Sequence, residues 1–448
     1  MKMIDFILNL LQTPAIVLSL VALIGLTLQG KNFGQVFSGT VKTALGMLIV
    51  SAGAGLIVQE IIPFSELFSS VFNLTGFATS SEAVVGALQT SVPLIASTSS
   101  LIMAFGFLVN IILARFSPLK YIFLTGHMMW ILSISIATSL VISDYIKMTI
   151  IILGSILQGM VLIILPAIAQ PTVRKIIQSD DFAMGHLTTL GTVPAGYIGG
   201  LLGNKENDAE KLELPKYLNF FKDTAMSISI VMVFFYLVLV IAAGPEKVSE
   251  YSGDQNFIIF GLMKGLGFAA GILVLLQGIR LFLGELVPAF KGISDKLVPG
   301  AKPALDVPVF FGIAPNSLMI GFVTSIIGML LAMAVSGFVL GVIPLISIIG
   351  SFFTGGTAGI FGNAHGGRRG AAIAGGVYGF LLIFMSGLFT KVVSYAQFGI
   401  QGVGYDTIDT TVVGMLMKNP IIGIIIITVV FVLLSYFEIK RLKKVKSV

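Results

Sequence analysis

The chain has 448 residues, of which 56% are hydrophobic and 11% are charged, and its mean hydropathy is +1.01. Soluble domains carry about 25% charged residues, so this composition excludes an ordinary soluble enzyme and indicates an integral membrane protein. The net charge of +6 comes without a basic patch interleaved with aromatics, and there is no cysteine, so nucleic-acid binding, disulfides and thiolate chemistry are not expected.

The first half of the chain, residues 14–203, alternates apolar helices with two mixed stretches. Met1–Leu28 lacks the basic start and small-residue cleavage site of a signal peptide, so we expect its apolar part, Pro14–Leu28, to be a retained first helix. The stretches 60–90 and 178–203 are too polar to span a membrane and too apolar for solvent loops, which predicts re-entrant hairpins. The other predicted spans are Val36–Val58, Val92–Arg115, Tyr121–Ile142 and Met148–Ile168.

Residues 204–223 carry dense mixed charge, which predicts a cytoplasmic loop between the halves. The second half, 224–439, contains 61 residues between Asp306 and Arg368 without a single Asp, Glu, Lys or Arg. That run is broken by Pro308, Pro315, Pro344 and Gly355-Gly356. Irregular backbone at membrane depth must be buried in protein or line a wet cavity, so the run is typical of a transporter. The basic tail 440–448 predicts a cytoplasmic C terminus.

Residues 1–448 are therefore interpreted as one all-α polytopic membrane unit with about ten or eleven transmembrane helices. A short pattern, Gly76-x-Ala78-x-x-Ser81, recurs as Gly312-x-Ala314-x-x-Ser317, at nearly the same spacing before His127 and His365. Since many transporters consist of inverted repeats whose broken helices meet at the midplane, we expect an inverted repeat here.

The chain has three histidines, His127, His186 and His365, each next to or near a glycine in an interrupted segment. A single such histidine is more often satisfied by a backbone carbonyl, but intramembrane ionisable residues are functional candidates. Asp306 has the alternative role of a helix cap, and Glu82 that of a solvated interfacial carboxylate. No His-x-x-x-His spacing, phosphate-binding loop or dinucleotide fingerprint is present, so no metal or other cofactor is expected.

Several motifs in the same order along residues 36–370 resemble those of the ascorbate-type IIC subunit of the bacterial phosphotransferase system. They are Gly39-Thr-Val-Lys-Thr-Ala-Leu-Gly46, Leu124-Thr-Gly-His127, Phe182-Ala-Met-Gly-His186, Gln277-Gly-Ile-Arg280, Ala289-Phe-Lys-Gly-Ile-Ser294, Pro299-Gly-Ala301 and Ala314-Pro-Asn316. The segment Leu214–Asp223 is similar too.

The resemblance implies a homodimer with a core and a scaffold domain, elevator-like movement, and phosphorylation of the sugar by a cytoplasmic IIB partner that IIA recharges. It also implies that the phosphoryl-donor cysteine lies on IIB, so this chain is a transport component in the bacterial cytoplasmic membrane rather than an enzyme. Substrate contacts carry over at His127, His186 and Asp306, and at Ser81 in place of the family's threonine. Asn316 and His365 are additional candidates.

Four family positions are changed. Ala54 stands for a serine, Glu82 for a tyrosine, and Ile131 and Leu187 for glutamines. Ligand pockets rely on a few placed polar groups, so these changes disfavour ascorbate, although the expected substrate remains ascorbate or a related sugar. The alternatives are a proton-coupled secondary transporter using Glu82, Asp306 and the histidines, and a receptor that binds a sugar without moving it. We expect His127, His186 and Asp306 to converge on one polar cavity.

Overall fold

The computed structural model describes residues 13–71, 76–77, 79–81, 84–85, 87–88, 92–212, 224–400 and 402–446. Within them, eight helices are long and apolar enough to cross a membrane, and two shorter apolar helices, Ala15–Leu28 and Gly126–Ile142, accompany them. This confirms the predicted all-α polytopic class. The helices are α2 (Pro14–Leu28), α3 (Phe33–Val71), α5 (Pro93–Phe116), α6 (Gly126–Ile142), α7 (Lys147–Ile177), α8 (Thr189–Leu202), α9 (Thr224–Ser252), α10 (Phe257–Lys296), α11 (Pro315–Leu340), α12 (Ile348–Gly350), α13 (Gly356–Val392), α14 (Ile408–Leu416) and α15 (Pro420–Lys446), with short turns η1 (Ala209–Lys211), η3 (Val307–Phe310), η4 (Ser351–Gly355) and η5 (Ala396–Phe398).

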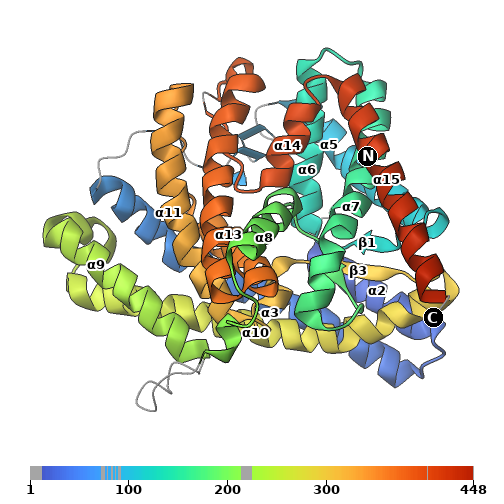
Figure 1. The fold of residues 1–448 in the computed structure, drawn as a ribbon, viewed down its shortest axis with the longest axis horizontal. Helices are drawn as coiled ribbons and strands as arrows, with labels where there is room; N and C mark the ends of the chain where they lie inside the picture. Colours follow the sequence, from blue (N-terminus) through green and yellow to red (C-terminus); the bar gives the residue numbers. More distant parts are fainter. Residues whose placement is uncertain are drawn as a thin grey trace.

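The helices form two groups. Helices α2, α3, α9 and α10 pack on one another along the lower part of Figure 1, and we call them the scaffold. Helices α5–α8 and α11–α15 stand above them, and we call them the core. The main contacts between the groups run from α10 to η3, from α3 to α12, and from α9 to α11.

Helices α3 and α10 are antiparallel and closely packed. A Cβ on Gly278 of α10 would collide with the backbone of Val50 in α3, so glycine is needed for this approach. An ion pair lies at each end of the contact: Lys42 Nζ–Glu285 Oε1 at 3.1 Å and Lys264 Nζ–Glu60 Oε2 at 2.8 Å. The two helices therefore run in opposite directions, as an inverted repeat requires.

Helix α3 is longer than predicted and takes residues 60–71 away from the first hairpin. The sequence placed its end near Val58, but it continues to Val71. Packing explains the extension, because Phe64 and Leu67 are buried and the Phe64 ring lies 5.1 Å from that of Tyr236 in α9. Part of the remaining hairpin, including Glu82, lies outside the described residues.

Three short parallel strands, absent from the predictions, lie inside the core. They are β1 (Tyr121–Phe123), β2 (Ala183–Met184) and β3 (Lys302–Leu305), in the order β1-β3-β2. The outer edge of β1 is covered by Asn110 of α5, whose Nδ2 donates to Tyr121 O at 3.1 Å and whose Oδ1 accepts from Phe123 N at 3.0 Å. These backbone groups on the β1 edge of the sheet therefore have hydrogen-bond partners in α5 and are not left unpaired.

A second, smaller strand cluster has the same plan. Phe77 pairs in parallel with Pro344, and Thr79 pairs in parallel with Gly404. Each cluster takes its two outer segments from one half of the chain and its central segment from the other half. Phe77 and Thr79 therefore correspond to β3, while Pro344 and Gly404 correspond to β1 and β2. This shared plan fits the predicted repeat, with β3 and the bridged residues Phe77 and Thr79 at its two centres rather than the glycine pattern.

The predicted register of the repeat was wrong for this physical reason. Gly312–Ser317 follow η3 and begin α11, whereas Gly76–Ser81 occupy the central segment of the second cluster. His127 starts α6, but His365 lies inside α13, just before the break at Gly366-Gly367. The similar spacings were therefore a coincidence of small residues.

The described part of the predicted cytoplasmic loop, 204–212, is docked rather than free. Asn363 Oδ1 accepts from Ala209 N at 2.9 Å, and its Nδ2 donates to Asp208 Oδ1 at 2.7 Å. Glu210 Oε1 accepts from Ser317 N at 2.8 Å and so satisfies the start of α11. The loop has a structural role at the ends of α11 and α13.

Candidate functional site

The carboxyl ends of the three core strands deliver the main candidate residues to one place. His127 follows β1 after three residues, His186 follows β2 after one residue, and Asp306 follows β3 directly. Asp306 Oδ2 lies 3.6 Å from His127 Nε2, and its Oδ1 lies 3.8 Å from His186 Nε2. The three side chains therefore meet as predicted, but the pocket beside them is lined mostly by apolar residues and His186 is not part of its lining.

Local geometry fixes each side chain. Gly185 N donates to Leu305 O at 2.6 Å, and a Cβ on Gly185 would collide with Ala304 O, so a larger residue would push His186 away from β3. Asp306 is also the cap of η3, because its Oδ1 accepts from Val307 N at 2.8 Å. The helix-cap role considered for Asp306 therefore coexists with its place between the two imidazoles.

A pocket opens over Asp306 between the core and the scaffold. The side chain of His127 is 42% exposed and that of Asp306 is 29% exposed, whereas His186 is 4% exposed. The pocket thus has an accessible carboxylate and one accessible imidazole, while the buried imidazole of His186 contacts Asp306 without lining the pocket. Its lining, mostly apolar, consists of Leu18, Met47, Val50, Leu124, Thr125, Gly126, His127, Ile279, Phe282, Leu305, Asp306, Pro308 and Val309.

Two buried polar atoms close to Asp306 have no hydrogen-bond partner among the described residues, and of the two residues that carry them Thr125 lines the pocket and His186 does not. They are His186 Nδ1 and Thr125 Oγ1. Most buried polar groups in native structures are paired, so unpaired ones beside a cavity point to a polar ligand or water. Sequence analysis missed Thr125, although it stands next to the Gly126-His127 motif.

Ser81 lies elsewhere, in the second strand cluster. It is fully buried, its hydroxyl donates to Asp406 Oδ1, and it accepts from Asp406 N at 3.2 Å. Ser81 is not among the residues that line the pocket over Asp306. The contact pairs Asp306–His186 and Ser81–Asp406 occupy corresponding places in the two clusters.

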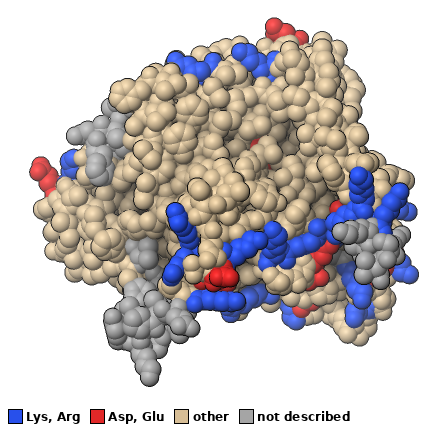
Figure 2. All heavy atoms as spheres, viewed as in Figure 1, with Lys and Arg blue, Asp and Glu red and all other residues tan. Residues whose placement is uncertain are grey.

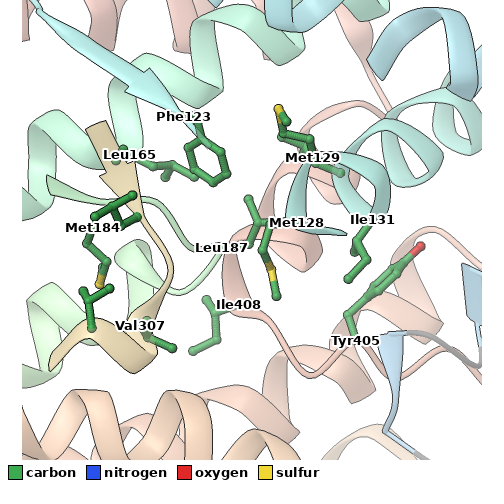
Figure 3. Packing of buried hydrophobic residues seen from close by; sticks show 14 of the residues in the cluster. Phe123, Met128, Met129, Ile131, Leu165, Met184, Leu187, Val307, Tyr405 and Ile408 are labelled. Carbon is green, nitrogen blue, oxygen red and sulfur yellow. The ribbon is translucent and has the colours of Figure 1, made fainter. Parts of the chain in front are cut away.

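Ile131 and Leu187, which replace the family's glutamines, point into an apolar cluster. Their exposed fractions are 1% and 0%. Figure 3 shows Ile131 beside Tyr405, and Leu187 beside Met128 and Ile408. The labelled neighbours of Leu187 offer an amide no hydrogen-bond partner, and the polar group beside Ile131, the Tyr405 hydroxyl, is already bonded to that of Tyr395. The wall between the two strand clusters is therefore hydrophobic.

The other predicted contacts are also away from Asp306. Ala54 is a half-buried residue of α3 that does not line the pocket. Asn316 Nδ2 donates to Ala209 O at 3.1 Å, so it anchors the loop 204–212. His365 Nε2 lies 2.9 Å from Thr172 Oγ1, and its ring centroid lies 4.4 Å from that of Tyr197, with the two rings tilted by 45°.

Two buried carboxylates were missed by sequence analysis. Asp406 is 7% exposed and Asp409 is 0% exposed. Both lie in the apolar stretch between Lys391 and Lys418, which has no other charged residue, and that isolation was the signal that could have identified them.

An ion network lies at the amino ends of the core strands. Asp180 Oδ1 accepts from Arg174 Nε at 2.8 Å and from Gln170 Nε2 at 2.8 Å, and Oδ2 pairs with Lys302. Burial raises the pKa of Asp180, but the hydrogen bonds from Lys302, Arg174 and Gln170 outweigh that effect, so the pKa lies below its usual value. The network ties α7 to β3 on the side of the sheet opposite Asp306.

Comparison with known proteins places this architecture in a family. The family model for the PTS system sugar-specific permease component, EIIC-GAT, matches residues 9–409. The chain is 28% identical over 451 aligned positions to the protein named "Ascorbate-specific PTS system EIIC component" of Mycoplasma pneumoniae. That alignment includes 87% of this chain and 66% of the relative, so the chain spans about two thirds of the relative's length.

The family match covers both halves of the repeat, all three core strands and the residues at their carboxyl ends. With several helices long enough to span a bilayer, it indicates a multi-pass membrane protein that acts as a transport component rather than as a catalytic enzyme. The chain belongs to the sugar-specific EIIC permease family of the phosphotransferase system.

Proposed function

We propose that the chain binds ascorbate or a related sugar at Asp306 and carries it inward for phosphorylation by a IIB partner. The observation that carries this proposal is the meeting of Asp306 with His127 and His186 at an accessible pocket. An ionised carboxylate accepts hydrogen bonds from two hydroxyls, and a neutral imidazole can both donate and accept. The apolar lining supplies the remaining contact with the sugar ring.

The arrangement of core and scaffold supports an elevator-like movement. The pocket is lined by the core strands on one side and by α2, α3 and α10 on the other, so a substrate at Asp306 sits at the boundary of the two groups. Sliding the core along the scaffold would move that boundary, and the substrate with it, across the membrane. The scaffold helices α3 and α10 are held together by their own close packing and ion pairs, so they would serve as the fixed part, shared between two copies in a homodimer.

Charge distribution supports a cytoplasmic C terminus. Figure 2 shows a band of Lys and Arg side chains along the lower part of this face, on the side where the C terminus lies in Figure 1. Lys302 and Arg174 belong to the ion network at the amino ends of the core strands. Positive charge stays on the cytoplasmic side of membrane proteins, so IIB would approach from this face.

The decisive experiment is uptake into vesicles with and without phosphoenolpyruvate and purified IIA and IIB. Radiolabelled ascorbate is the first probe, followed by neutral sugars and polyols. Sugar phosphate that accumulates only with the complete relay supports the proposal. Uptake of unmodified sugar driven by a proton gradient would select the secondary transporter instead, and binding without uptake would select the receptor.

The IIB docking face is tested separately. Lys205 is exposed and has no ion pair among the described residues, and Lys211 lies in η1 beside it; Lys216 lies outside the described range. Reversing Lys205 and Lys211 to Glu should slow phosphorylation and leave sugar binding intact. Unchanged phosphorylation at limiting IIB would assign docking to another part of the face.

Substrate choice is tested by competition binding. A carboxylate at Asp306 disfavours an anionic sugar, and Glu82, where the family has a tyrosine, adds a second carboxylate next to Ser81 in the sequence. A neutral sugar or polyol should therefore bind better here than to an ordinary ascorbate IIC. Tight ascorbate binding that no neutral sugar matches would overturn this expectation.

A further inference from the structure

We infer that the segment Gly404–Asp409 is a positioning element for both candidate hairpins, and that Asp409 holds the backbone turn that carries His186. The inference deepens the proposed function, because it assigns a role to carboxylates that do not touch the pocket. It rests on the hydrogen bonds of Asp409 and Asp406, which reach two different hairpins from one short segment of the second half.

Asp409 is joined to the His186 turn by three hydrogen bonds. Its Oδ2 accepts from Thr189 N at 2.8 Å, and its Oδ1 accepts from Leu190 N at 2.7 Å. Its own backbone N donates to Leu187 O at 3.2 Å. The residues bonded on this turn are the first, third and fourth after His186. Rotation of the turn would break all three contacts.

A carboxylate suits this place for an electrostatic reason. Thr189 and Leu190 are the first residues of α8, and their N–H groups have no partner inside the helix. The positive end of the helix dipole stabilises an anion there, and hydrogen bonds to an ionised acceptor are stronger than neutral ones. Asp409 is completely buried, so water cannot replace it. Thr188, the residue before α8, makes no side-chain cap of its own.

Asp406 makes the corresponding contact to the other hairpin. It bonds Ser81 through both its side chain and its backbone N, and Gly404 pairs with Thr79 two residues earlier. Between the two acids lie Thr407 and Ile408, and Ile408 packs beside Leu187 in Figure 3. Within this segment, Asp406 therefore holds the Ser81 hairpin and Asp409 holds the His186 turn, each through its own hydrogen bonds.

The test uses the fact that the chain has three histidines. Protein labelled with ¹³C and ¹⁵N at histidine is purified in detergent without sugar, and the three imidazole signals are assigned with His127→Gln and His365→Gln. In Asp409→Asn, the amide has one acceptor oxygen in place of the two carboxylate oxygens. The N–H group of Thr189 or Leu190 then faces the amide N–H₂, which is also a donor. We expect the His186 signal to shift and broaden, and the His365 signal to stay in place.

Asp406→Asn is the matched control, because it changes a neighbouring buried acid that bonds the other hairpin. In this variant the chemical shift of the His186 signal should change by less than the line width. If Asp409→Asn does not fold, Asp409→Glu keeps the charge but displaces it by one methylene, and the same shift of His186 is expected.

Thermal unfolding separates positioning from general stability. A fall in Tm with an unmoved His186 signal would make Asp409 a structural residue and overturn the inference. A shift of His186 in Asp406→Asn as large as that in Asp409→Asn would overturn it as well. These readouts need neither sugar nor phosphorylation, so failure of the transport assay would count against the proposed function alone.

Discussion

The two strand clusters share a backbone plan and differ in the side chains that follow their central segments. In the first cluster Asp306 follows β3, is 29% exposed and faces a pocket with two imidazoles. In the second, Ser81 follows Thr79, is fully buried and is bonded to Asp406. The comparison teaches that the repeat provides two equivalent places for a polar contact, and that the side chains decide which one is open to a substrate.

The largest effect is expected at the first cluster, the open one, where Asp306 faces the pocket. Asp306→Asn removes the charge that both imidazoles face, and it should weaken sugar binding about 100-fold, because each hydrogen bond to a charged group contributes about 1.5–3 kcal/mol. Isothermal titration with the sugar found in the uptake assay measures it. Asp254→Asn, in the connection between α9 and α10, is the control and should bind normally. Equal affinity in Asp306→Asn would mean that the substrate binds elsewhere.

The two ion pairs that join α3 to α10 allow a second comparison, between a more buried contact and a more exposed one. The Glu60–Lys264 pair is more buried than the Lys42–Glu285 pair, with side-chain exposures of 16% and 22% against 49% and 28%. Glu60→Gln should therefore lower the free energy of unfolding by about 2 kcal/mol, and Glu285→Gln by about 0.5 kcal/mol. Denaturation in a mild detergent compares the two variants. Equal losses would show that burial does not distinguish the two ends.

A smaller loss is expected at the closed cluster. Ser81→Ala removes the hydroxyl from Asp406 and should lower the free energy of unfolding by about 1.5 kcal/mol, with less than a few-fold change in sugar affinity. Unfolding and binding are measured on the same preparation. A loss of affinity as large as that of Asp306→Asn would contradict the distinction between an open and a closed cluster, and would make Ser81 a direct contact.

The smallest effect concerns the ion network behind the first cluster. The pKa of Asp180 is lower in the folded protein than in an unfolded chain, so its stabilising contribution is present above about pH 4 and is lost as the pH falls through the folded value. The Tm difference between wild type and Asp180→Asn should therefore shrink as the pH is lowered below about 4. A difference that is constant with pH would remove the ion pair as its cause.

The meeting of Asp306, His127 and His186 could be predicted from sequence, because all three match the family's motifs and each is an isolated polar group next to a chain breaker in an apolar run. The parallel strands could not, since two to four residues give no usable period in a chain that is apolar throughout. The register of the repeat failed for the same reason: with 51 glycines, small-residue patterns recur by chance. Asp406 and Asp409 required the tertiary structure, because their partners lie in other hairpins.

The burial of Ile131 and Leu187 was also beyond sequence reasoning. The resemblance placed them at sugar-contacting positions, but the side chains belong to the apolar wall between the clusters. Whether a residue at a helix start faces a cavity or its neighbours depends on the packing of distant elements, here Tyr405 and Ile408.

Each half of the chain supplies the central segment of the cluster whose outer segments belong to the other half, and this arrangement has a consequence for biosynthesis. When the ribosome has released the first half, β1 and β2 have an empty place between them, and residues 77–79 have no neighbours to pair with. Unpaired strand edges cannot face lipid, so these segments must stay shielded from lipid until Lys302–Leu305, and finally Gly404, have been inserted. The site at Asp306 is therefore assembled late, only after Lys302–Leu305 has joined β1 and β2.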